Sequence, residues 1–284
     1  PARRGFDEAL VTAGKHFNFV TDPPVDYPQG QYLADFLTDR AVDFIQRHKA
    51  EPFFLYLPFN AVHDPFQGPE DRPTADGPKR GNRTRAVYKA MLESLDKNVG
   101  RVMAHLDAAG LAENTVVFFL SDNGGVPQIG RNLPFRGNKG SLWEGGIRTP
   151  LVARWKGRFP AGRKAPDMVV GMDLFATCVS LAGAALPAGL RLDGVNLIEA
   201  CLGTGRVQRD TLYFHHGKQE AMISQGWKYL LDGDGEEHLF RLSEDIGETN
   251  DRKQAEPQRL ASMKAAYAQW KADVFRAGGE DWVK

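Results

Sequence analysis

Apolar residues recur at the spacing of one helix face in two long segments of the chain, at 31–49 and 84–109. In the first segment these positions are Leu33, Phe36, Leu37, Ala41, Phe44 and Ile45. In the second segment they are Val87, Met91, Leu95, Val99, Val102 and Leu106. Because residues three and four positions apart share a helix face, both segments are predicted to be helices that bury one side. Gly110 is expected to end the second helix.

Two short runs carry an apolar residue at every position, which favours strands that are covered on both faces. They are Phe53–Leu57, which follows Pro52, and TVVFFL at 115–120. Five prolines fall at positions 58, 65, 69, 73 and 78, so a loop is predicted between the first run and the second helix. Strand, long helix and strand in this order predict a right-handed βαβ unit. The predicted fold class is therefore α/β, with a mostly parallel sheet flanked by helices.

The pattern changes after about residue 205. Short segments at 211–215, 220–224, 227–231 and 238–242 are separated by glycines or acidic turns, which is typical of an antiparallel meander. A last helix is predicted from the apolar positions Leu260, Met263, Tyr267, Trp270 and Val274. We therefore expect an α/β domain at 1–205 and a smaller domain at 206–284, in which a small antiparallel sheet packs against a terminal helix.

Charge and cysteine content exclude several classes of protein. The 36 basic and 36 acidic side chains cancel, which argues against binding to nucleic acid or to an anionic membrane. No apolar run approaches the length of a membrane span. Two cysteines, Cys178 and Cys201, are too few for a disulfide scaffold. The chain opens PARRGFDEAL, without an initiator Met or a signal-peptide pattern, so we expect its natural beginning to lie elsewhere.

Polar side chains follow both apolar runs, at the place where ligands bind in open α/β sheets. Asp122 and Asn123 come directly after the second run, and a carboxylate beside an amide oxygen suits Ca²⁺ or Mg²⁺. Two ligands do not complete a metal site, so further carboxylates must come from elsewhere. Asp-Asn-Gly-Gly is also a common turn sequence, and a plain turn is the competing interpretation.

His63 and Lys139 are the candidates for chemistry on an anionic substrate. His63 stands a few residues after the first run, and histidine, which titrates near neutral pH, suits binding an anion or protonating a leaving oxygen. Lys139 lies among seven glycines between positions 124 and 146, which would let the backbone approach a ligand closely. Its compact ammonium suits an anionic oxygen group. The competing interpretations are a surface histidine and an ordinary solvated lysine.

Three blocks, in this order, resemble the type I sulfatase family of the alkaline phosphatase superfamily: PFFLYLPFNAVHDPFQ at 52–67, TVVFFLSDNGG at 115–125 and RGNKGSLWEGGIRTP at 136–150. Downstream segments such as GWKYLL and HLFRLSEDIGETND look like the corresponding family segments. The resemblance implies an alkaline phosphatase-like fold and an arylsulfatase-like hydrolase that cleaves the sulfate ester of a sulfated carbohydrate or an aryl sulfate. It also implies calcium as cofactor and a periplasmic, secreted or lysosome-like location.

The resemblance assigns roles to matching positions in this chain. Asp122 and Asn123 match the family's calcium ligands. His63 and Lys139 match the residues that contact the sulfate and its bridging, leaving-group oxygen. Glu144 and Arg148 match a block that is expected to shape the loop around Gly145 and Gly146.

One part of the family pattern is missing from the sequence. The family's nucleophile is a Cys or Ser in a C/S-x-P-x-R motif that is oxidised to formylglycine, and neither Cys178 nor Cys201 stands in such a motif. RGFDEAL at the start resembles a segment that follows the motif in the family. We therefore expect this chain to be the later portion of a sulfatase, inactive alone. Its formylglycine and the aspartates that complete the calcium site would lie upstream, which makes a complementary N-terminal polypeptide an expected partner.

Two other functions compete with the sulfatase prediction. The first is a phosphomonoester, phosphodiester or phosphonate hydrolase of the same superfamily, which would be favoured by two transition metals in place of one calcium. The second is an inactive fragment or a sulfate-binding module. An upstream reading frame or second polypeptide that carries C/S-x-P-x-R would distinguish the enzyme from the fragment.

Overall fold

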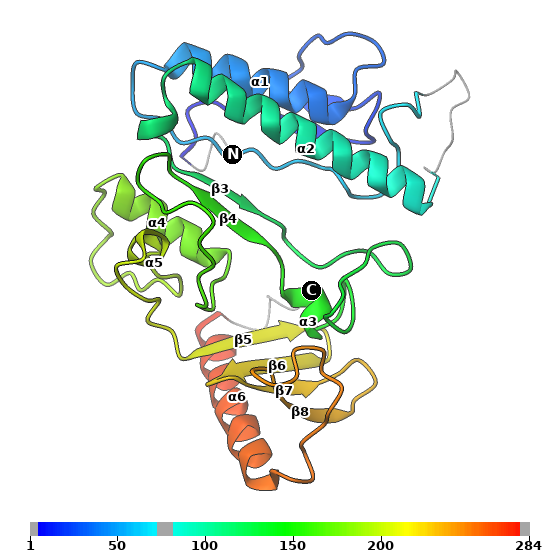
Figure 1. Ribbon diagram of the computed structural model, residues 1–284, viewed down its shortest axis with the longest axis vertical. Helices are drawn as coiled ribbons and strands as arrows, with labels where there is room; N and C mark the ends of the chain where they lie inside the picture. Colours follow the sequence, from blue (N-terminus) through cyan, green and yellow to red (C-terminus); the bar gives the residue numbers. More distant parts are fainter. Residues whose placement is uncertain (1–4, 73–81, 279–284) are drawn as a thin grey trace. The chain divides into compact units, whose positions relative to one another are not determined.

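The computed structural model describes residues 5–72 and 82–278, which form two compact units at 1–115 and 116–284 (Figure 1). The elements of the first unit are β1 (Val11–Ala13), β2 (Val20–Asp22), α1 (Leu33–His48), α2 (Arg85–Ala108) and η2 (Ala112–Asn114). Those of the second unit are β3 (Val117–Leu120), α3 (Glu144–Ile147), β4 (Leu151–Arg154), α4 (Met172–Leu181), α5 (Ile198–Leu202), β5 (Thr211–His216), β6 (Gln219–Ser224), β7 (Trp227–Leu231), β8 (Glu237–Arg241) and α6 (Pro257–Gly278).

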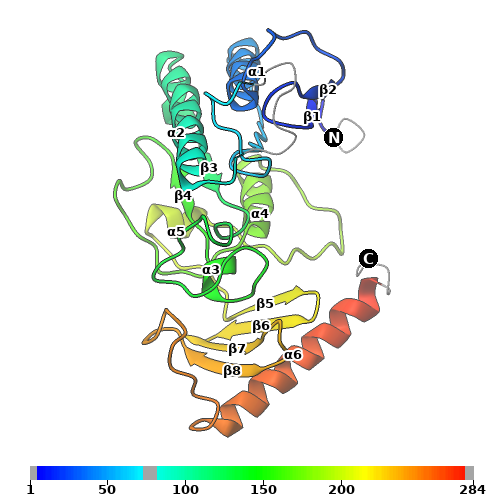
Figure 2. The same cartoon turned by 90° about the vertical axis from the view of Figure 1, so that its right-hand side faces the viewer.

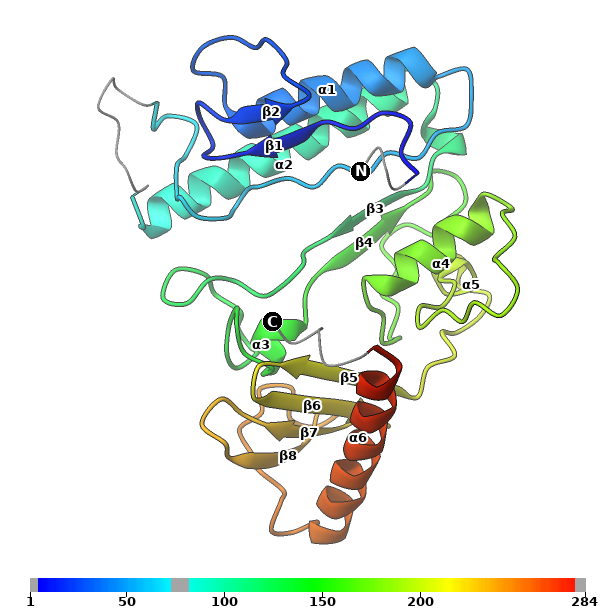
Figure 3. The ribbon, with the colours of Figure 1, turned by 180° about the vertical axis from the view of Figure 1, so that it is seen from behind.

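Both predicted long helices are confirmed in the first unit. α1 and α2 run side by side (Figure 1), and β1 pairs with β2 beside α1 (Figure 3). The predicted apolar face of α1 is buried, with Phe36 and Ile45 each 1% exposed. α2 begins after Thr84, whose side-chain oxygen accepts a hydrogen bond from the backbone N–H of Val87 at 3.2 Å. This N-cap satisfies one of the N–H groups that a helix end leaves without a partner.

The predicted strand at 53–57 is not a strand in the structure, and the expectation that both its faces are covered is wrong. Its side chains alternate: Phe54 and Tyr56 are 59% and 67% exposed, whereas Phe53, Leu55 and Leu57 are half-buried. The inward side packs on the α1 side of the unit, where Leu57 joins the cluster around Phe36. The segment therefore has one covered face and one bare face. In the described part of the loop that follows, 58–72, no helix or strand forms, and residues 73–78 lie outside the described residues.

In the second unit, the predicted strand at 115–120 is present as β3, but its partner is antiparallel. β4 follows β3 along the chain and pairs with it in the register Val117↔Arg154 to Leu120↔Leu151. All strand pairs within the described residues are antiparallel, so the central parallel sheet is not confirmed and stays a prediction. Phe119 and its cross-strand partner Val152 are 38% and 57% exposed, so this ribbon also has a bare apolar face.

The predicted C-terminal meander and terminal helix are confirmed. β5, β6, β7 and β8 form one antiparallel sheet in sequence order, and α6 lies across it (Figure 2). Successive side chains of a strand point to opposite faces, so the sheet has two apolar faces. One face, with Met222 and Tyr229, packs against Met263 and Tyr267 of α6. The other face packs against Leu142 and Trp143. Val274 of α6 departs from the predicted apolar side, being 46% exposed.

The face of this sheet that points away from α6 holds the Lys139 segment. Leu230 and Phe240, on the face away from α6, are buried against Leu142 and Trp143, three and four residues after Lys139. The strand periodicity of the C-terminal sheet thus provides an apolar base for the segment that carries the candidate lysine. Within the described residues, none of the helices has the length and apolar character needed to cross a membrane.

Candidate functional site

The turn that follows β3 is tied to the turn that precedes β4. The backbone N–H of Ser121 donates to the carbonyl of Pro150 at 3.2 Å, and that of Gly124 donates to the carbonyl of Gly146 at 2.9 Å. Ser121 Oγ also donates to the Asn123 carbonyl at 3.0 Å. These bonds extend the β3–β4 pairing past the ends of both strands. The predicted metal ligands therefore stand on a backbone that is fixed from two sides.

Asp122 and Asn123 both present oxygen atoms for a cation. Asp122 is exposed, and its Oδ1 accepts the backbone N–H of Asn123 at 2.9 Å, which leaves Oδ2 for another partner. Asn123 Nδ2 donates to the Gly124 carbonyl at 2.9 Å, so the amide oxygen is the atom left for a ligand. A carboxylate and an amide oxygen fit a hard cation such as Ca²⁺. No group of three or more His, Cys, Asp and Glu side chains suited to a metal gathers within residues 5–72 and 82–278.

The isolated chain should bind Ca²⁺ weakly, with a Kd above about 1 mM, because calcium sites use six or more oxygens and these two residues supply only two. Isothermal titration calorimetry of the 284 residues with CaCl₂ measures this directly. Asp122→Asn serves as the control for any heat that does not come from this turn. A Kd in the micromolar range that is lost in Asp122→Asn would contradict the incomplete ligand set.

Lys139 is half-buried on a loop built against the Asp122–Asn123 turn. Its backbone N–H donates to the carbonyl of Gly125 at 3.0 Å, and Asn132 Oδ1 accepts the Gly125 N–H at 2.8 Å. After Lys139 the chain turns back, with the Ser141 N–H donating to the carbonyl of Asn138 at 3.0 Å. The structure thus brings Lys139, Asp122 and Asn123 onto one connected loop system in the second unit.

The glycines of this loop let backbone pack against backbone. A Cβ atom on Gly124 would lie 1.7 Å from the Gly145 carbonyl oxygen, and one on Gly146 would lie 2.0 Å from the Ser141 carbonyl oxygen. A Cβ on Gly145 would meet the Gly137 carbonyl oxygen at 2.4 Å. Atoms at such separations overlap, so each of these positions requires a residue without a side chain. The sequence interpretation assigned the glycines to ligand approach, whereas these three are explained by the internal contacts of the loop.

Gly124→Ala should lower the free energy of unfolding by about 3 kcal/mol or more, because the added methyl group meets a carbonyl group of the backbone rather than a flexible side chain. Urea unfolding followed by circular dichroism measures the change. Gly100→Ala in α2 is the matched control, since a Cβ there meets nothing within 4 Å. Alanine in an open helix position should stabilise by about 0.5–1 kcal/mol. Equal effects of the two substitutions would contradict the packing of the loop.

A buried ionic cluster lies behind the Lys139 loop, and the sequence reasoning missed most of it. Lys228 Nζ in β7 lies 2.9 Å from Glu144 Oε1 and 2.7 Å from Glu248 Oε1, and all three side chains are at most 2% exposed. Arg148 Nη1 lies 3.3 Å from Glu144 Oε2, which agrees with the loop-shaping role expected for this pair. Burial raises the pKa of Glu248, and the ammonium of Lys228 opposes that rise. The sequence signal for this cluster is Lys228 itself, a lysine inside the otherwise apolar strand WKYLL.

His63 belongs to the first unit, where it is exposed at the end of a tethered loop. Its Nδ1 lies 2.9 Å from the Asp64 carbonyl, so this nitrogen carries the proton and Nε2 is left for a ligand. The His63 carbonyl accepts from Nε2 of His16 at 3.0 Å. His16 is 2% exposed, and burial lowers its pKa, which keeps it a neutral donor near pH 7. His63 and the other three candidates lie in different units, so their convergence at one sheet edge stays a prediction.

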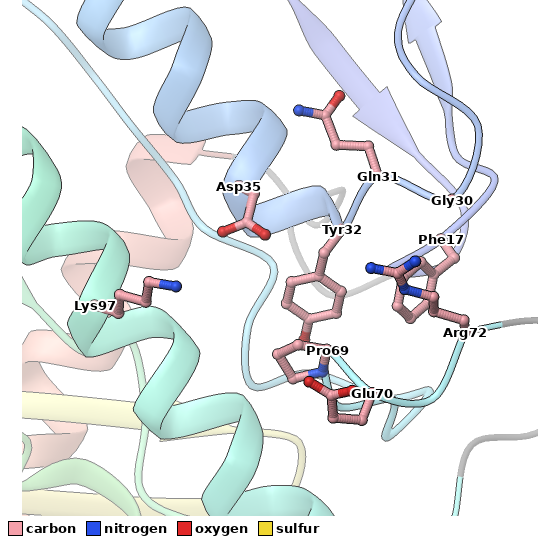
Figure 4. Close-up of a pocket in the computed structure, with 9 residues that line it drawn as sticks. All are labelled: Phe17, Gly30, Gln31, Tyr32, Asp35, Pro69, Glu70, Arg72 and Lys97. Atoms are coloured by element: carbon pink, nitrogen blue, oxygen red, sulfur yellow. The ribbon is translucent and has the colours of Figure 1, made fainter.

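The first unit also contains a hollow of about 340 Å³. Figure 4 shows its walls, in which Tyr32 stands between the charged side chains Asp35, Glu70 and Arg72, with Lys97 on the α2 side. Tyr32 is itself tied down, since its hydroxyl donates to the Gln67 carbonyl at 2.8 Å. Neither His63 nor any of the other three predicted site residues lines this hollow.

Comparisons with known proteins agree with these local features. A family profile described as "Sulfatase" matches residues 2–184, and one described as "N-sulphoglucosamine sulphohydrolase, C-terminal" matches residues 137–234. N-acetylgalactosamine-6-sulfatase of Canis lupus familiaris is 33% identical over 255 residues, which cover 80% of this chain and 47% of that protein. Steryl-sulfatase of Mus musculus is 36% identical over 206 residues, which cover 69% of this chain and 31% of that protein.

A solved structure is similar in fold to this chain over most of its length. The crystal structure of Ps i-CgsB is 31% identical to this chain, with a TM-score of 0.77 over 89% of this chain and 57% of that one. Ps i-CgsB has also been solved in complex with k-i-k-neocarrahexaose. This chain spans about half or less of the length of the curated relatives named above. Because the "Sulfatase" profile matches more than half of its residues, the chain belongs to the sulfatase family.

Proposed function

We propose that this chain is the later part of a sulfuric ester hydrolase that acts on a sulfated carbohydrate. The observation that carries the proposal is the loop system in which Lys139 is fixed beside Asp122 and Asn123, inside a chain of the sulfatase family. A cation next to two hard oxygen ligands suits an anionic ester whose departing oxygen gains negative charge. In this proposal the catalytic α/β domain covers 1–205 and a C-terminal subdomain covers 206–284.

Four residues have assigned roles in the proposed site. Asp122 and Asn123 would each supply one oxygen to a calcium ion, and upstream aspartates would complete its ligand set. When bound, the ion would supply positive charge to neutralise sulfate oxygens. Lys139 holds its ammonium against the sulfate and its bridging oxygen, where it stabilises developing negative charge. His63 would act as the imidazolium, in which Nδ1–H keeps its bond to the Asp64 carbonyl and Nε2–H donates its proton to the leaving oxygen.

The nucleophile is proposed to come from sequence outside these 284 residues. The chain matches 47% and 31% of the two curated relatives, so the matched enzymes contain as much or more sequence beyond this portion. A formylglycine residue from that region would supply the attacking group. Bare apolar faces support a complementary segment: Phe54 and Tyr56 are exposed in the first unit, and Phe119 and Val152 in the second. Unpaired edges and exposed apolar strips of this kind favour docking of further strands, as a mostly parallel, alkaline phosphatase-like central sheet requires.

The names of the relatives support a carbohydrate as the substrate. One curated relative is named for the 6-sulfate of N-acetylgalactosamine, and the solved relative was crystallised with an oligosaccharide-type ligand, k-i-k-neocarrahexaose. Steryl-sulfatase, a relative at similar identity, is named for a different substrate. An aryl sulfate is therefore used to test the reaction itself, because it favours neither class of natural substrate.

The test compares two esters of the same leaving group on the complete protein, with the upstream portion present and matured by a formylglycine-generating system. We expect kcat/KM for p-nitrophenyl sulfate to exceed that for p-nitrophenyl phosphate. Chelation of calcium should reduce the sulfate rate, and added Zn²⁺ should not replace calcium. A higher rate on the phosphate ester that depends on transition metals would overturn the sulfatase proposal in favour of a phosphoester hydrolase.

A further inference from the structure

The Lys139 loop is fastened to the C-terminal sheet by a side chain at the start of β6. Gln219 Nε2 donates to the carbonyl of Gly140 at 2.9 Å, and Gln219 Oε1 accepts the backbone N–H of Leu142 at 3.1 Å. Both bonded residues stand within three positions of Lys139. A single amide thus makes two hydrogen bonds to the backbone on the C-terminal side of the candidate lysine, which fixes the direction in which the loop leaves it.

β7 provides a second attachment between the C-terminal sheet and the Lys139 loop. Lys228 and Leu230 are two positions apart in β7 and therefore point to the same face of the sheet, the face that packs against Leu142 and Trp143. Lys228 is fully buried and pairs with Glu144 at 2.9 Å and Glu248 at 2.7 Å. Glu248 Oε2 in turn accepts the backbone N–H of Glu144 at 2.7 Å. The ammonium therefore fixes both the side chain and, through Glu248, the backbone of Glu144.

The charges in this cluster favour one arrangement of the loop. Two carboxylates, Glu144 and Glu248, face one fully enclosed ammonium and the partly exposed guanidinium of Arg148. Buried charges require close partners, so any displacement of Glu144 from Lys228 would leave this carboxylate with only the partly exposed Arg148. Glu144 is five residues after Lys139 and begins α3, into which the loop leads. The cluster and Gln219 thus restrict the loop from two neighbouring strands.

We infer that Gln219 and Lys228 are positioning residues for Lys139, so that the C-terminal sheet determines where the cation of the active site stands. The inference rests on the proposed function of Lys139. Catalysis by a point charge depends on placement, and a misplacement of about 1 Å costs on the order of 10²-fold in rate. A lysine on a glycine-rich loop has no rigid element of its own, and the fastening by β6 and β7 provides one.

The test uses Gln219→Met and Lys228→Met in the complete, matured protein, with Gln269→Met as the matched control. Gln269 is exposed on α6, and its side-chain bonds go only to Asp273 of the same helix among the contacts described. For each variant, kcat and KM are measured on a series of aryl sulfates whose leaving-group pKa spans several units. Hydrogen exchange of the 136–148 segment is followed by mass spectrometry.

Gln219→Met should lower kcat about tenfold with KM within about twofold, since misplacement by part of an ångström affects the transition state more than ground-state binding. The loss should grow as the leaving group becomes poorer, because a displaced Lys139 stabilises the departing oxygen less. Exchange should rise in 136–148 and stay unchanged in α6. A merely structural role would lower the amount of folded enzyme without changing the leaving-group dependence.

Wild-type kcat and leaving-group dependence in Gln219→Met would overturn the inference, provided that Lys139→Ala is strongly impaired in the same assay. Should Lys139→Ala instead match the wild type, the proposed function itself has failed. If Lys228→Met does not fold, Gln219→Met decides alone. In that variant methionine replaces a glutamine of similar size, and Gln219 lies outside the ionic cluster.

Discussion

The purified 284 residues should show no turnover of p-nitrophenyl sulfate above the uncatalysed rate, and the upstream portion should restore it. No residue of the chain stands in C/S-x-P-x-R, so the chain contains no precursor of formylglycine. Lys139 and His63 can stabilise charge, but charge stabilisation without an attacking group leaves most of the barrier in place. With the upstream portion present and matured, kcat should reach the ordinary enzyme range, on the order of 1–10³ s⁻¹.

The measurement is a p-nitrophenol release assay on three samples: the chain alone, the upstream portion alone, and the two produced together. A fourth sample contains the upstream portion with its formylglycine precursor replaced by alanine, and it should be inactive. Turnover by the 284 residues alone that is abolished by Lys139→Ala would show that the nucleophile lies within this chain.

Lys228→Met should lower the free energy of unfolding by about 3–5 kcal/mol, because it leaves the buried Glu248 without its cation and leaves Glu144 with only the partly exposed Arg148. Lys228 and Glu248 are fully buried and Glu144 is 2% exposed, so solvent cannot replace the lost charge. The measurement is urea unfolding monitored by tryptophan fluorescence at neutral pH. Adding Glu144→Gln and Glu248→Gln to Lys228→Met should recover part of the loss, since the uncompensated charges are then removed.

Lys264→Met is the matched control for Lys228→Met. Lys264 pairs with Glu237 at 2.5 Å, but both side chains are more than a third exposed, so the pair is screened by solvent. Removing it should change the free energy of unfolding by less than about 1 kcal/mol. Similar losses in Lys228→Met and Lys264→Met would contradict the structural importance assigned to the buried cluster.

Local sequence patterns were sufficient to predict the helices and strands that are defined by the spacing of their own residues. α1, α2 and α6 follow from apolar spacing, and the meander β5–β8 follows from short segments between turns. Periodicity predicts most of their buried positions. It does not predict the buried polar residues Ser94 and Asn98 of α2 or the exposed Val274 of α6. The same reasoning failed at 53–57, because an unbroken apolar run does not reveal how many neighbouring strands are present to cover it.

Only part of the candidate site was predictable from the sequence. Asp122 and Lys139 were found from residue type and from the family resemblance, and the structure places them on one loop system. Lys228 was missed because its partners lie 84 and 20 residues away in sequence, and a long-range buried pair leaves no local pattern. The glycines at 124, 145 and 146 were recognised, but their contacts with one another's backbone became apparent only in the folded loop.

The most direct test of the central claim, that Lys139 is the active-site cation of a sulfatase, is the kcat of Lys139→Ala in the complete protein on p-nitrophenyl sulfate. Removing one charge-stabilising group should lower kcat about 10²–10³-fold while the unfolding midpoint is unchanged. Lys218→Ala, an exposed lysine between β5 and β6, should retain the wild-type rate. A Lys139→Ala enzyme that hydrolyses the sulfate ester as fast as the wild type and Lys218→Ala would contradict the claim.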